Sequence, residues 1–594
     1  MTIRKMFFSL GTTFLRGITF LGLTMLLALP ATADDQEEFQ KILKEHWEFT
    51  LRENPVMASD LGDRRYNDRL GRASLKDHAR RNAYNEEILK RLDRIDPEKL
   101  SEDDRINYRL FRREREMDRE SYAFKSYLFN ITNRGGWHMS FARLPGLLSF
   151  QKAQDYRDYI SRLKDYPRLN AENMEVMRTA IKEGFVHACA PMQGYEGSIA
   201  SHIVEKAEDS VFYAPFKTMP KTIPVAEQDK LRTKARKAIL EQVVPAYESF
   251  YKLYTEEYAP NCMEKVGASH WPNGKAYYEH RVRNYTTTDM TPHEVHERGL
   301  AEVKRIRGEM MKIIKDVGFD GDLQDFISFL RTDPRFYPKT PEELVRHVST
   351  IAKKMDGELP KLFGYLPRQP YGVKEVPADI AEKTTTAYYM PGAPDGSRAG
   401  FYYINTSKLD SRPLYTLEAL TLHEAVPGHH LQIALASETD LPPFRRYGGY
   451  TVFVEGWALY AERLGLEVGF YQDPYSNFGR LSYEMWRALR LVVDTGMHYL
   501  GWTRQQAIDF MAENSALSLH NITAEVDRYI TWPGQALAYK TGELKIRELR
   551  QRAEDALGKD FDLRAFHDEL LRHGALPLSI LEENMDRWIK ARTS

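Results

Sequence analysis

The stretch TLEALTLHEAVPGHHLQIALA, from 416 to 436, carries two pairs of polar residues in an apolar, helical frame. The pairs are His423-Glu424 and His429-His430. In a zinc-binding HExxH helix the two histidines are four residues apart on one face, and the glutamate beside the first one holds a water molecule. The stretch therefore predicts a related metal-binding helix with Glu424 as general base, but with an altered spacing.

The altered spacing requires a distortion of the helix. In a regular helix His429 would lie about 120° round from His423, and His430 would lie about 10.5 Å further along the axis. Pro427 cannot donate a backbone hydrogen bond to the carbonyl group of His423, and Gly428 can adapt to a bend. We expect a kink or bulge that returns one histidine of the pair to His423. His429 is favoured as the second zinc ligand, with His430 as the alternative.

A third ligand is expected from the next helical segment, YTVFVEGWALYAERLG at 450–465. Glu455 and Glu462 are seven residues apart on one face of it, and that face is otherwise apolar. We assign Glu455 as the third ligand. Glu462 suits a position behind a ligating histidine, where a carboxylate fixes the tautomer of the ring. The alternative is that both are solvated acids on an amphipathic helix.

The rest of the chain predicts a mostly α, large multi-helical fold. Helical periodicity dominates, and the segments 291–294 and 340–343 each place Thr-Pro and a glutamate as helix-start signals. Strand signals are scarce. The segments 384–389 and 401–405 are rich in Thr, Tyr, Phe and Ile around turn residues, and they predict a small β-hairpin or sheet beside the metal-binding helix.

Three regions are expected along the chain: a signal peptide at 1–33, an N-terminal helical lobe at 34–375, and a C-terminal catalytic lobe at 376–594. Proline residues clustered near 367–377 indicate the seam between the lobes. The two lobes are expected to form one cleft.

The first residues indicate export. Basic residues precede a nearly continuous apolar run at 17–29, and Ala31-Thr32-Ala33 provides a cleavage site before Asp34. The alternative is an uncleaved anchor, but the run is shorter than the roughly 20 residues that a spanning helix needs. We therefore expect a periplasmic or secreted protein with no stable membrane insertion after cleavage.

Charge and cysteine content narrow the class further. Lys+Arg total 84 and Asp+Glu total 85, so a net charge of -1 argues against nucleic acid as a partner. The only cysteines are Cys189 and Cys262, which an oxidising compartment would join in a disulfide. Two buried free thiols are the alternative. Their separation rules out a zinc knuckle, so a metal site must use histidine and carboxylate ligands.

Four motifs carry a resemblance to a family: HEAVPGHHLQ at 423–432, EGWALYAE at 455–462, RLVVDTGMH at 490–498 and RYITWPGQALAYKTG at 528–542. With these motifs the chain resembles the bacterial domain-of-unknown-function 885 family over nearly its whole mature length. The resemblance implies a zincin-like (gluzincin) helical fold with a deep cleft. It also implies His423, His429 and Glu455 as ligands, with Glu424 as base.

Other polar residues near these motifs are candidates for contacts with substrate. His498 and Tyr529 could donate to the oxyanion of a tetrahedral intermediate, and Lys540, Arg490 and Tyr539 could bind a substrate, including its free carboxylate. Each of them could equally be a core residue or part of an ion pair.

Together these features predict an exported zinc peptidase that hydrolyses oligopeptides, with a carboxypeptidase or dipeptidase as the expected type, although they leave exo- versus endopeptidase action open. Zn²⁺ is the expected cofactor and a peptide the expected partner. The alternatives are a non-catalytic helical binding protein on the same scaffold and a zinc amidase that acts on non-peptide substrates. The sequence leaves the oligomeric state open.

Overall fold

The computed structural model describes residues 32–381, 384–393, 396 and 398–593. Residues 1–31 of the expected signal peptide lie outside this range. The described chain is mostly helical, as predicted. Within it, no helix combines the length and the apolar character needed to cross a membrane.

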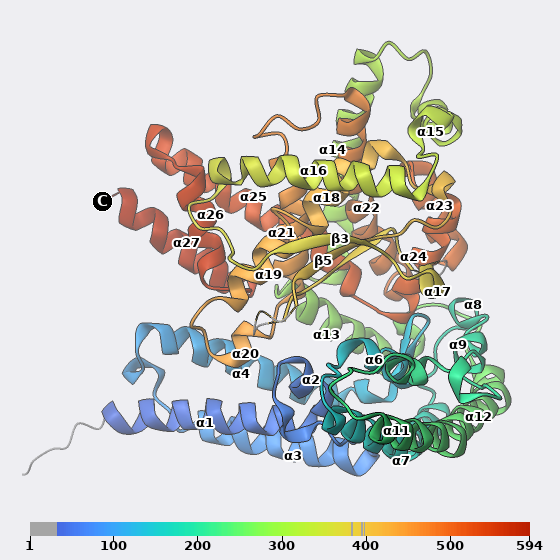
Figure 1. Ribbon diagram of the computed structural model, residues 1–594. Coiled ribbons are helices and arrows are strands. Elements are labelled where there is room, and N and C mark those ends of the chain that lie inside the picture. The colour runs from blue at the N-terminus through green and yellow to red at the C-terminus, as the bar shows by residue number, and fades with distance from the viewer. Residues whose placement is uncertain (1–31, 382–383, 394–395, 397, 594) are drawn as a thin grey trace, which may run out of the picture.

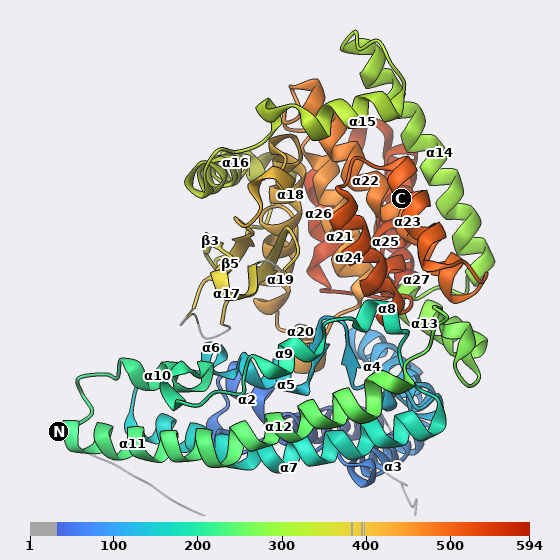
Figure 2. The same ribbon diagram turned by 90° about the vertical axis from the view of Figure 1, so that its right-hand side faces the viewer.

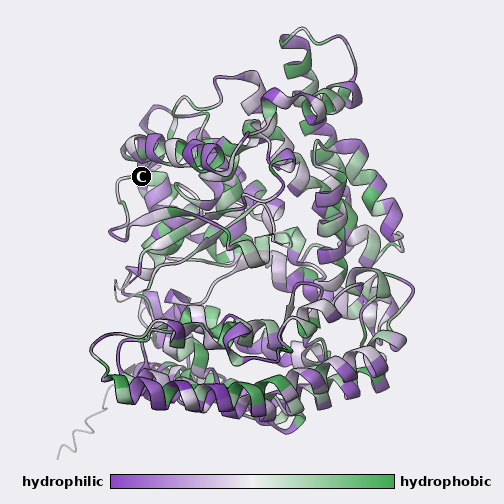
Figure 3. Cartoon of the chain, turned by 45° about the vertical axis from the view of Figure 1, so that its right-hand side comes forward, coloured by the Kyte–Doolittle hydropathy of each residue, from purple (hydrophilic) through white to green (hydrophobic). Residues whose placement is uncertain are grey.

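The first part of the chain forms the lower layer of Figure 1. Its helices are α1 Thr32–Glu53, α2 Pro55–Asp60, α3 Leu75–Leu92, α4 Glu102–Ala123, α5 Trp137–Ala142, α6 Leu144–Leu147, α7 Ala153–Glu183, α8 Cys189–Met192, α9 Glu196–Ala200, α10 Ala214–Lys217, α11 Val225–Ala238 and α12 Val244–Leu253, with the short strands β1 Ile131–Thr132 and β2 Gly135–Gly136. Polar and apolar residues alternate along its long helices (Figure 3). This alternation arises because one side of each helix packs against the protein and the other side faces solvent. In α1, Phe39 and Ile42 are fully buried while residues on the opposite side are exposed.

The remaining helices form the upper body, seen from the side in Figure 2. They are α13 Gly274–Thr286, α14 Pro292–Asp316, α15 Leu323–Thr332, α16 Pro341–Leu362, α17 Ala378–Ala381, α18 Leu417–Glu424, α19 His429–Ser437, α21 Thr451–Leu464, α22 Pro474–His498, α23 Arg504–Asn514, α24 Leu519–Thr531, α25 Ala538–Leu557, α26 Leu563–Arg572 and α27 Leu578–Thr593. The exception is α20 Pro443–Arg446, which lies against α1 in the lower layer. The start signals predicted at Thr291 and Thr340 are confirmed, since each hydroxyl accepts the backbone N–H three residues on.

The hydrophobic cores do not divide the chain at residue 375. Buried residues of α14 to α16 share one core with α18, α22 and α24, although the sequence places 292–362 in the first lobe. Another core in the lower layer consists of buried residues between Leu70 and Tyr258. The position of the boundary between the two lobes stays a prediction.

A three-stranded sheet lies beside α18. The hairpin predicted from the sequence consists of β4 Ala387–Met390 and β5 Gly400–Ile404, which pair antiparallel. A third strand that the sequence did not indicate, β3 Tyr371–Glu375, pairs parallel to β5 at the place where the proline cluster predicted a seam. This sheet covers one side of the motif that carries His423.

Helices α21 and α25 cross at unusually close range. A Cβ added to Gly542 would lie 1.9 Å from the carbonyl oxygen of Val452, and one added to Gly456 would lie 2.5 Å from the Cα of Gly542. Glycine at both positions therefore lets the two backbones touch. The crossing fixes α21, which carries Glu455 and Glu462.

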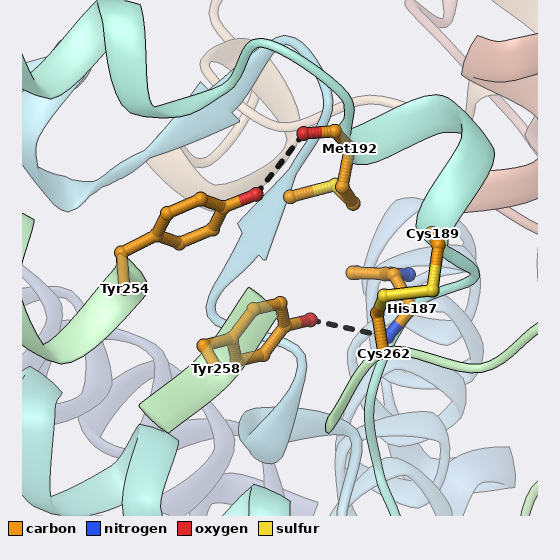
Figure 4. The surroundings of a disulfide bond; sticks show 6 residues. All are labelled: His187, Cys189, Met192, Tyr254, Tyr258 and Cys262. Carbon is orange, nitrogen blue, oxygen red and sulfur yellow. Dashed lines mark hydrogen bonds between the residues drawn. A yellow bond between two sulfur atoms is a disulfide. The ribbon is translucent and has the colours of Figure 1, made fainter. Parts of the chain in front are cut away.

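Cys189 and Cys262 are joined in a disulfide, with their Cα atoms 5.0 Å apart (Figure 4). Next to it, the hydroxyl of Tyr258 accepts the backbone N–H of His187 at 3.1 Å. The disulfide bond ties the start of α8 to the segment that follows α12, in agreement with the predicted pairing of Cys189 with Cys262.

Candidate metal centre

The chain between α18 and α19 brings His423 and His429 together. Helix α18 ends at Glu424, the chain passes through the cis Val426-Pro427 peptide, and α19 begins at His429. The two imidazole ring centroids are 4.7 Å apart. In place of the kink or bulge expected in one helix, the structure has two helices, and the extra residues of the spacing lie in the break between them.

Gly428 and Trp457 hold this break in place. A Cβ at Gly428 would lie 2.0 Å from the carbonyl oxygen of His423, so no larger residue fits without moving the backbone. The indole Nε1 of Trp457 donates to the carbonyl oxygen of Pro427 at 2.9 Å. Because Trp457 belongs to α21, the break is joined directly to the helix that carries Glu455.

Glu455 completes a cluster with the two histidines. Its Oε2 lies 3.7 Å from Nε2 of His423 and 3.5 Å from Nε2 of His429. Ligand atoms of the three residues all lie within 4.8 Å of one another. Both separations from the carboxylate exceed those of good N–H···O hydrogen bonds. Within the described chain, Oε2 of Glu455 and Nδ1 of His429 are buried without a hydrogen-bond partner.

Glu462 lies behind His423. Its Oε1 is 2.8 Å from Nδ1 of His423 and 3.2 Å from the guanidinium of Arg487. A carboxylate at that distance favours the proton on Nδ1, so a neutral His423 would present the lone pair of Nε2 toward Glu455. This is the position that the sequence suggested for Glu462.

The charges in the cluster act strongly on one another. Burial alone would lower the pKa of His423, but the nearby carboxylates of Glu455 and Glu462 outweigh burial and raise the pKa to about 9. Burial would raise the pKa of Glu455, but His423 and His429 hold it well below the usual range. The two carboxylates therefore favour positive charge between the side chains.

His430 faces away from the cluster, toward the sheet. The hydroxyl of Tyr389 and Nδ1 of His430 are 2.8 Å apart, and the Tyr371 ring lies 4.6 Å from the imidazole. Burial lowers the pKa of His430 to about 4. His429, which follows the break directly, is the member of the pair that meets His423.

Glu424 is the last residue of α18 and is mostly buried. The negative charge of Glu424 adds to burial in raising the pKa of Tyr402 on β5, which indicates that the two side chains lie near each other. Glu424 therefore lies near the sheet, at the end of the helix that carries His423 and directly before the break.

His498 does not face the cluster. Its Nδ1 accepts the backbone N–H of Ala268 at 2.9 Å, and its Nε2 lies 2.9 Å from the carbonyl oxygen of Tyr529. The ring is fully buried, and burial lowers its pKa to about 4. Since backbone groups occupy both ring nitrogens, His498 joins distant segments, and we do not retain it as an oxyanion donor.

Lys540 is also occupied. Its ammonium lies 2.9 Å from Glu302, 2.8 Å from Glu484 and 2.8 Å from Glu543, and the side chain is fully buried. An ammonium group has three donors, and three carboxylates take them. Lys540 therefore belongs to an ion cluster between α14, α22 and α25 and is not free to bind a substrate carboxylate.

Arg490 and Tyr539, by contrast, lie together, and the guanidinium of Arg490 is only partly occupied by hydrogen-bond partners. The Arg490 guanidinium is 4.2 Å from the Tyr539 ring centroid. Arg490, Arg528 and Arg134 all bind the single carboxylate of Glu525, at 3.1, 3.1 and 3.3 Å. Nη1 of Arg490 is buried without a hydrogen-bond partner in the part of the chain that the structure describes. Three guanidinium groups around one carboxylate leave an excess of positive charge.

Tyr529 contacts this basic cluster, and Tyr539 lies near both the cluster and Glu455. The Tyr529 hydroxyl accepts from Nε of Arg490 at 2.8 Å, and burial raises its pKa to about 12. Burial raises the pKa of Tyr539, the charge of Glu455 raises it further, and Arg490 lowers it. Tyr539 is thus close enough to both groups to feel their charges.

Several residues that shape this region had no signal in the sequence. Trp457, Arg487 and Tyr389 are ordinary helix and strand residues by local pattern, and Glu525 is one acid among many. Each is recognised only from its partner in a distant segment. Their contacts with Pro427, Glu462, His430 and Arg490 are all made between segments that are separated in the chain.

Comparison with known proteins agrees with the motifs. The chain is similar to a solved structure from Colwellia psychrerythraea described as a "putative lipoprotein", with 28% identity, a TM-score of 0.87, and coverage of 94% of this chain and 99% of the other. A "putative lipoprotein of unknown function" from Shewanella oneidensis shares the fold, with 18% identity, a TM-score of 0.67, and coverage of 92% and 99%. No curated protein matches. Residues 55–585 match the family described as "Bacterial protein of unknown function (DUF885)", and the chain therefore belongs to that family.

Proposed function

We propose that this protein is a zinc-dependent peptidase in which His423, His429 and Glu455 hold the ion. The observation that carries the proposal is the convergence of three ligand atoms: Nε2 of His423 and Nε2 of His429 lie 3.7 and 3.5 Å from Oε2 of Glu455. With zinc bonds of about 2.0–2.1 Å and tetrahedral angles, two ligand atoms are about 3.3–3.4 Å apart. The separations are too long for mutual hydrogen bonds and close to those of ligands that share one ion.

The surrounding residues fit a catalytic centre of this kind. A bound zinc ion would supply a Lewis acid and an activated water. Glu462 presents Nε2 of His423 as a ligand atom through its contact with Nδ1. Glu424, next to His423 and outside the ligand set, would take the proton of the water and pass it to the leaving amine. We also propose that α18, α19 and α21 together form a gluzincin-like metal site.

The basic cluster supports a substrate with a free carboxylate. Nη1 of Arg490 has no partner among the described residues, and Arg490, Arg528 and Arg134 share one carboxylate. An added carboxylate would offset this charge and could bind a guanidinium group in two-pronged fashion. Tyr539 is close enough to Glu455 and Arg490 to feel both charges. We therefore favour a carboxypeptidase or dipeptidase over an endopeptidase.

The proposed location is outside the cytoplasm. The signal-like sequence at 1–33 and the description of both similar structures as putative lipoproteins support it. A peptide pool in the periplasm would be the natural source of substrate for such an enzyme.

The proposal is tested with purified mature protein, by elemental analysis for zinc and by mass spectrometry of a digested peptide mixture. Glu424→Gln should keep zinc and lose about 10²- to 10⁴-fold of the activity or more, because it keeps the side-chain size but removes the base. Asp440→Asn, an exposed acid beyond α19, is the matched control and should change neither property.

The outcomes separate the alternatives. Absence of stoichiometric zinc, or full activity in Glu424→Gln, would overturn the mechanism. Zinc without peptide hydrolysis, but with cleavage of non-peptide amides that depends on Glu424, would favour an amidase. Zinc-free protein that still binds peptides would favour a binding protein on this scaffold.

A further inference from the structure

The lower layer contains a cavity that is separate from the metal centre. It has a volume of about 480 Å³ and is bounded by residues of α1, α3 and α4 and by the segment from Phe444 to Gly448. None of its lining residues belongs to the cluster of His423, His429 and Glu455. We call it the α1–α3–α4 cavity.

Four buried polar atoms of its lining have no hydrogen-bond partner within the described residues. They are Nδ1 of His46, the hydroxyl of Tyr84, Nε of Arg115 and Oγ of Ser126. His46 is only 8% exposed. A buried polar group without a partner is unfavourable, so four around one cavity indicate a polar ligand.

The charges of the lining favour a cation. Glu114 and Asp118 lie one turn apart on α4, and both share the single guanidinium of Arg115, at 3.6 and 3.0 Å. Glu114 is largely buried, and burial raises its pKa to about 7. The other lining guanidinium, Arg81, is already bound to Glu53 at 3.5 Å and to a backbone carbonyl. Arg80, which is outside the lining, also binds Glu53 at 2.6 Å, so the excess of negative charge lies at Glu114 and Asp118 beside Arg115.

The walls of the cavity are aromatic. The rings of Phe49 and Tyr84 stack at 3.7 Å, and those of Tyr122 and Tyr127 stack at 5.4 Å. Trp47 stacks on Tyr447 at 5.7 Å, which adds an indole ring to the lining. Aromatic faces attract cations and also cover apolar groups.

From this combination we infer that the α1–α3–α4 cavity binds an organic cation, namely a primary ammonium group on an aromatic or apolar body. Glu114 and Asp118 would accept from the ammonium, the hydroxyls of Tyr84 and Ser126 would complete its hydrogen bonds, and the rings would cover the apolar body. An anion of the same size would face Glu53, Glu114 and Asp118 with both arginines already engaged.

The cavity is also linked to the metal-binding region. The hydroxyl of Tyr450 donates to Oε1 of Glu114 at 3.4 Å, and Tyr450 is the residue that precedes α21. The binding proposal nevertheless rests on the cavity alone and does not depend on the peptidase activity.

Three small probes with the same ring test the inference by isothermal titration calorimetry: 2-phenylethylamine, 2-phenylethanol and 2-phenylethyl methyl ether. The full mature protein should bind the amine at least about 10-fold more tightly than the alcohol or the ether, which corresponds to about 1.4 kcal/mol. Glu114→Gln should reduce the affinity for the amine by at least the same factor. Glu87→Gln, an exposed acid on α3 outside the cavity, is the matched control and should leave it unchanged.

Two further variants keep the test decisive. If Glu114→Gln fails to fold by circular dichroism, Asp118→Asn takes its place, since its side chain is 59% exposed at the cavity. Glu424→Gln should bind the amine like the parent whether or not it hydrolyses peptides, which separates this inference from the proposed function. No binding of the amine at millimolar concentration, equal binding of all three probes, or equal affinity in the Glu114 and Glu87 variants would overturn it.

Discussion

The adjacent histidines of α19 allow a paired experiment in which each substitution changes one property. His429→Ala removes Nε2, which lies 3.5 Å from Oε2 of Glu455. His430→Ala leaves the cluster intact but removes one partner of the Tyr389 hydroxyl, at 2.8 Å. If the cluster holds zinc, the first variant should lose metal affinity and the second should lose stability.

The two magnitudes follow from these contacts. Loss of a residue that only supports a zinc ligand costs about 10- to 100-fold in metal affinity, so loss of the ligand itself should exceed about 100-fold, or about 2.7 kcal/mol. His430→Ala removes one hydrogen-bond partner of the half-buried Tyr389, whose hydroxyl also bonds to the backbone of Gly392, so the free energy of unfolding should fall by about 0.5–1.5 kcal/mol. The zinc affinity of His430→Ala should equal that of the parent.

Competition with a chromophoric chelator measures the zinc affinity, and urea denaturation of the metal-free proteins measures stability. Thermal melts with added zinc provide a second readout, because a ligand that binds only the folded state stabilises it by about 2.7 kcal/mol at 100 times its Kd. Zinc should raise the Tm of the parent and of His430→Ala, but much less that of His429→Ala. Equal zinc affinity in His429→Ala and the parent, or loss of zinc in His430→Ala alone, would refute the ligand assignment.

Three more predictions follow from the contacts described above. Glu462→Gln should weaken zinc binding by about 10- to 100-fold in the same chelator assay, because the carboxylate behind His423 is lost; an unchanged affinity would contradict this. Asp494 has a pKa raised by burial from 3.8 to about 7, so the folded state disfavours its ionised form and stability should fall as pH rises between these values. Asp494→Asn should remove up to about 4 kcal/mol of that fall, measured as the difference between urea unfolding at pH 4 and pH 8, and equal pH dependence in both proteins would speak against it. Cys189 and Cys262 should resist thiol labelling in denatured protein until a reductant is added, and because the bond spans 73 residues its removal should cost about 4 kcal/mol; labelling without reductant would disprove the bond.

Much of the fold could be predicted because it depends on neighbouring residues. The helix starts at Thr291 and Thr340 depend on a hydroxyl and a backbone N–H three residues away, and the hairpin of β4 and β5 depends on two short strands and the turn between them. The strand β3 was missed because β4 lies between it and its partner β5 in the chain.

The candidate site was likewise predictable only where it depends on neighbouring residues. The local motif indicated His423 and Glu424, and the seven-residue spacing indicated Glu455 and Glu462 on one helix face. Whether these two helices meet was outside the reach of local pattern. It depends on the close crossing at Gly456 and Gly542 and on the bond from Trp457 to Pro427.

The helical class, the helix starts, the hairpin and the residue types of the cluster could be predicted from the chain alone, because periodicity, capping and turn chemistry act within a few residues. The choice between His429 and His430 as the residue that meets His423 required the folded structure. The folded structure also decided that His498 and Lys540 are occupied, by Ala268 and Tyr529 and by three glutamates. The physical reason is that a polar side chain is free or satisfied according to partners that packing brings from distant parts of the chain.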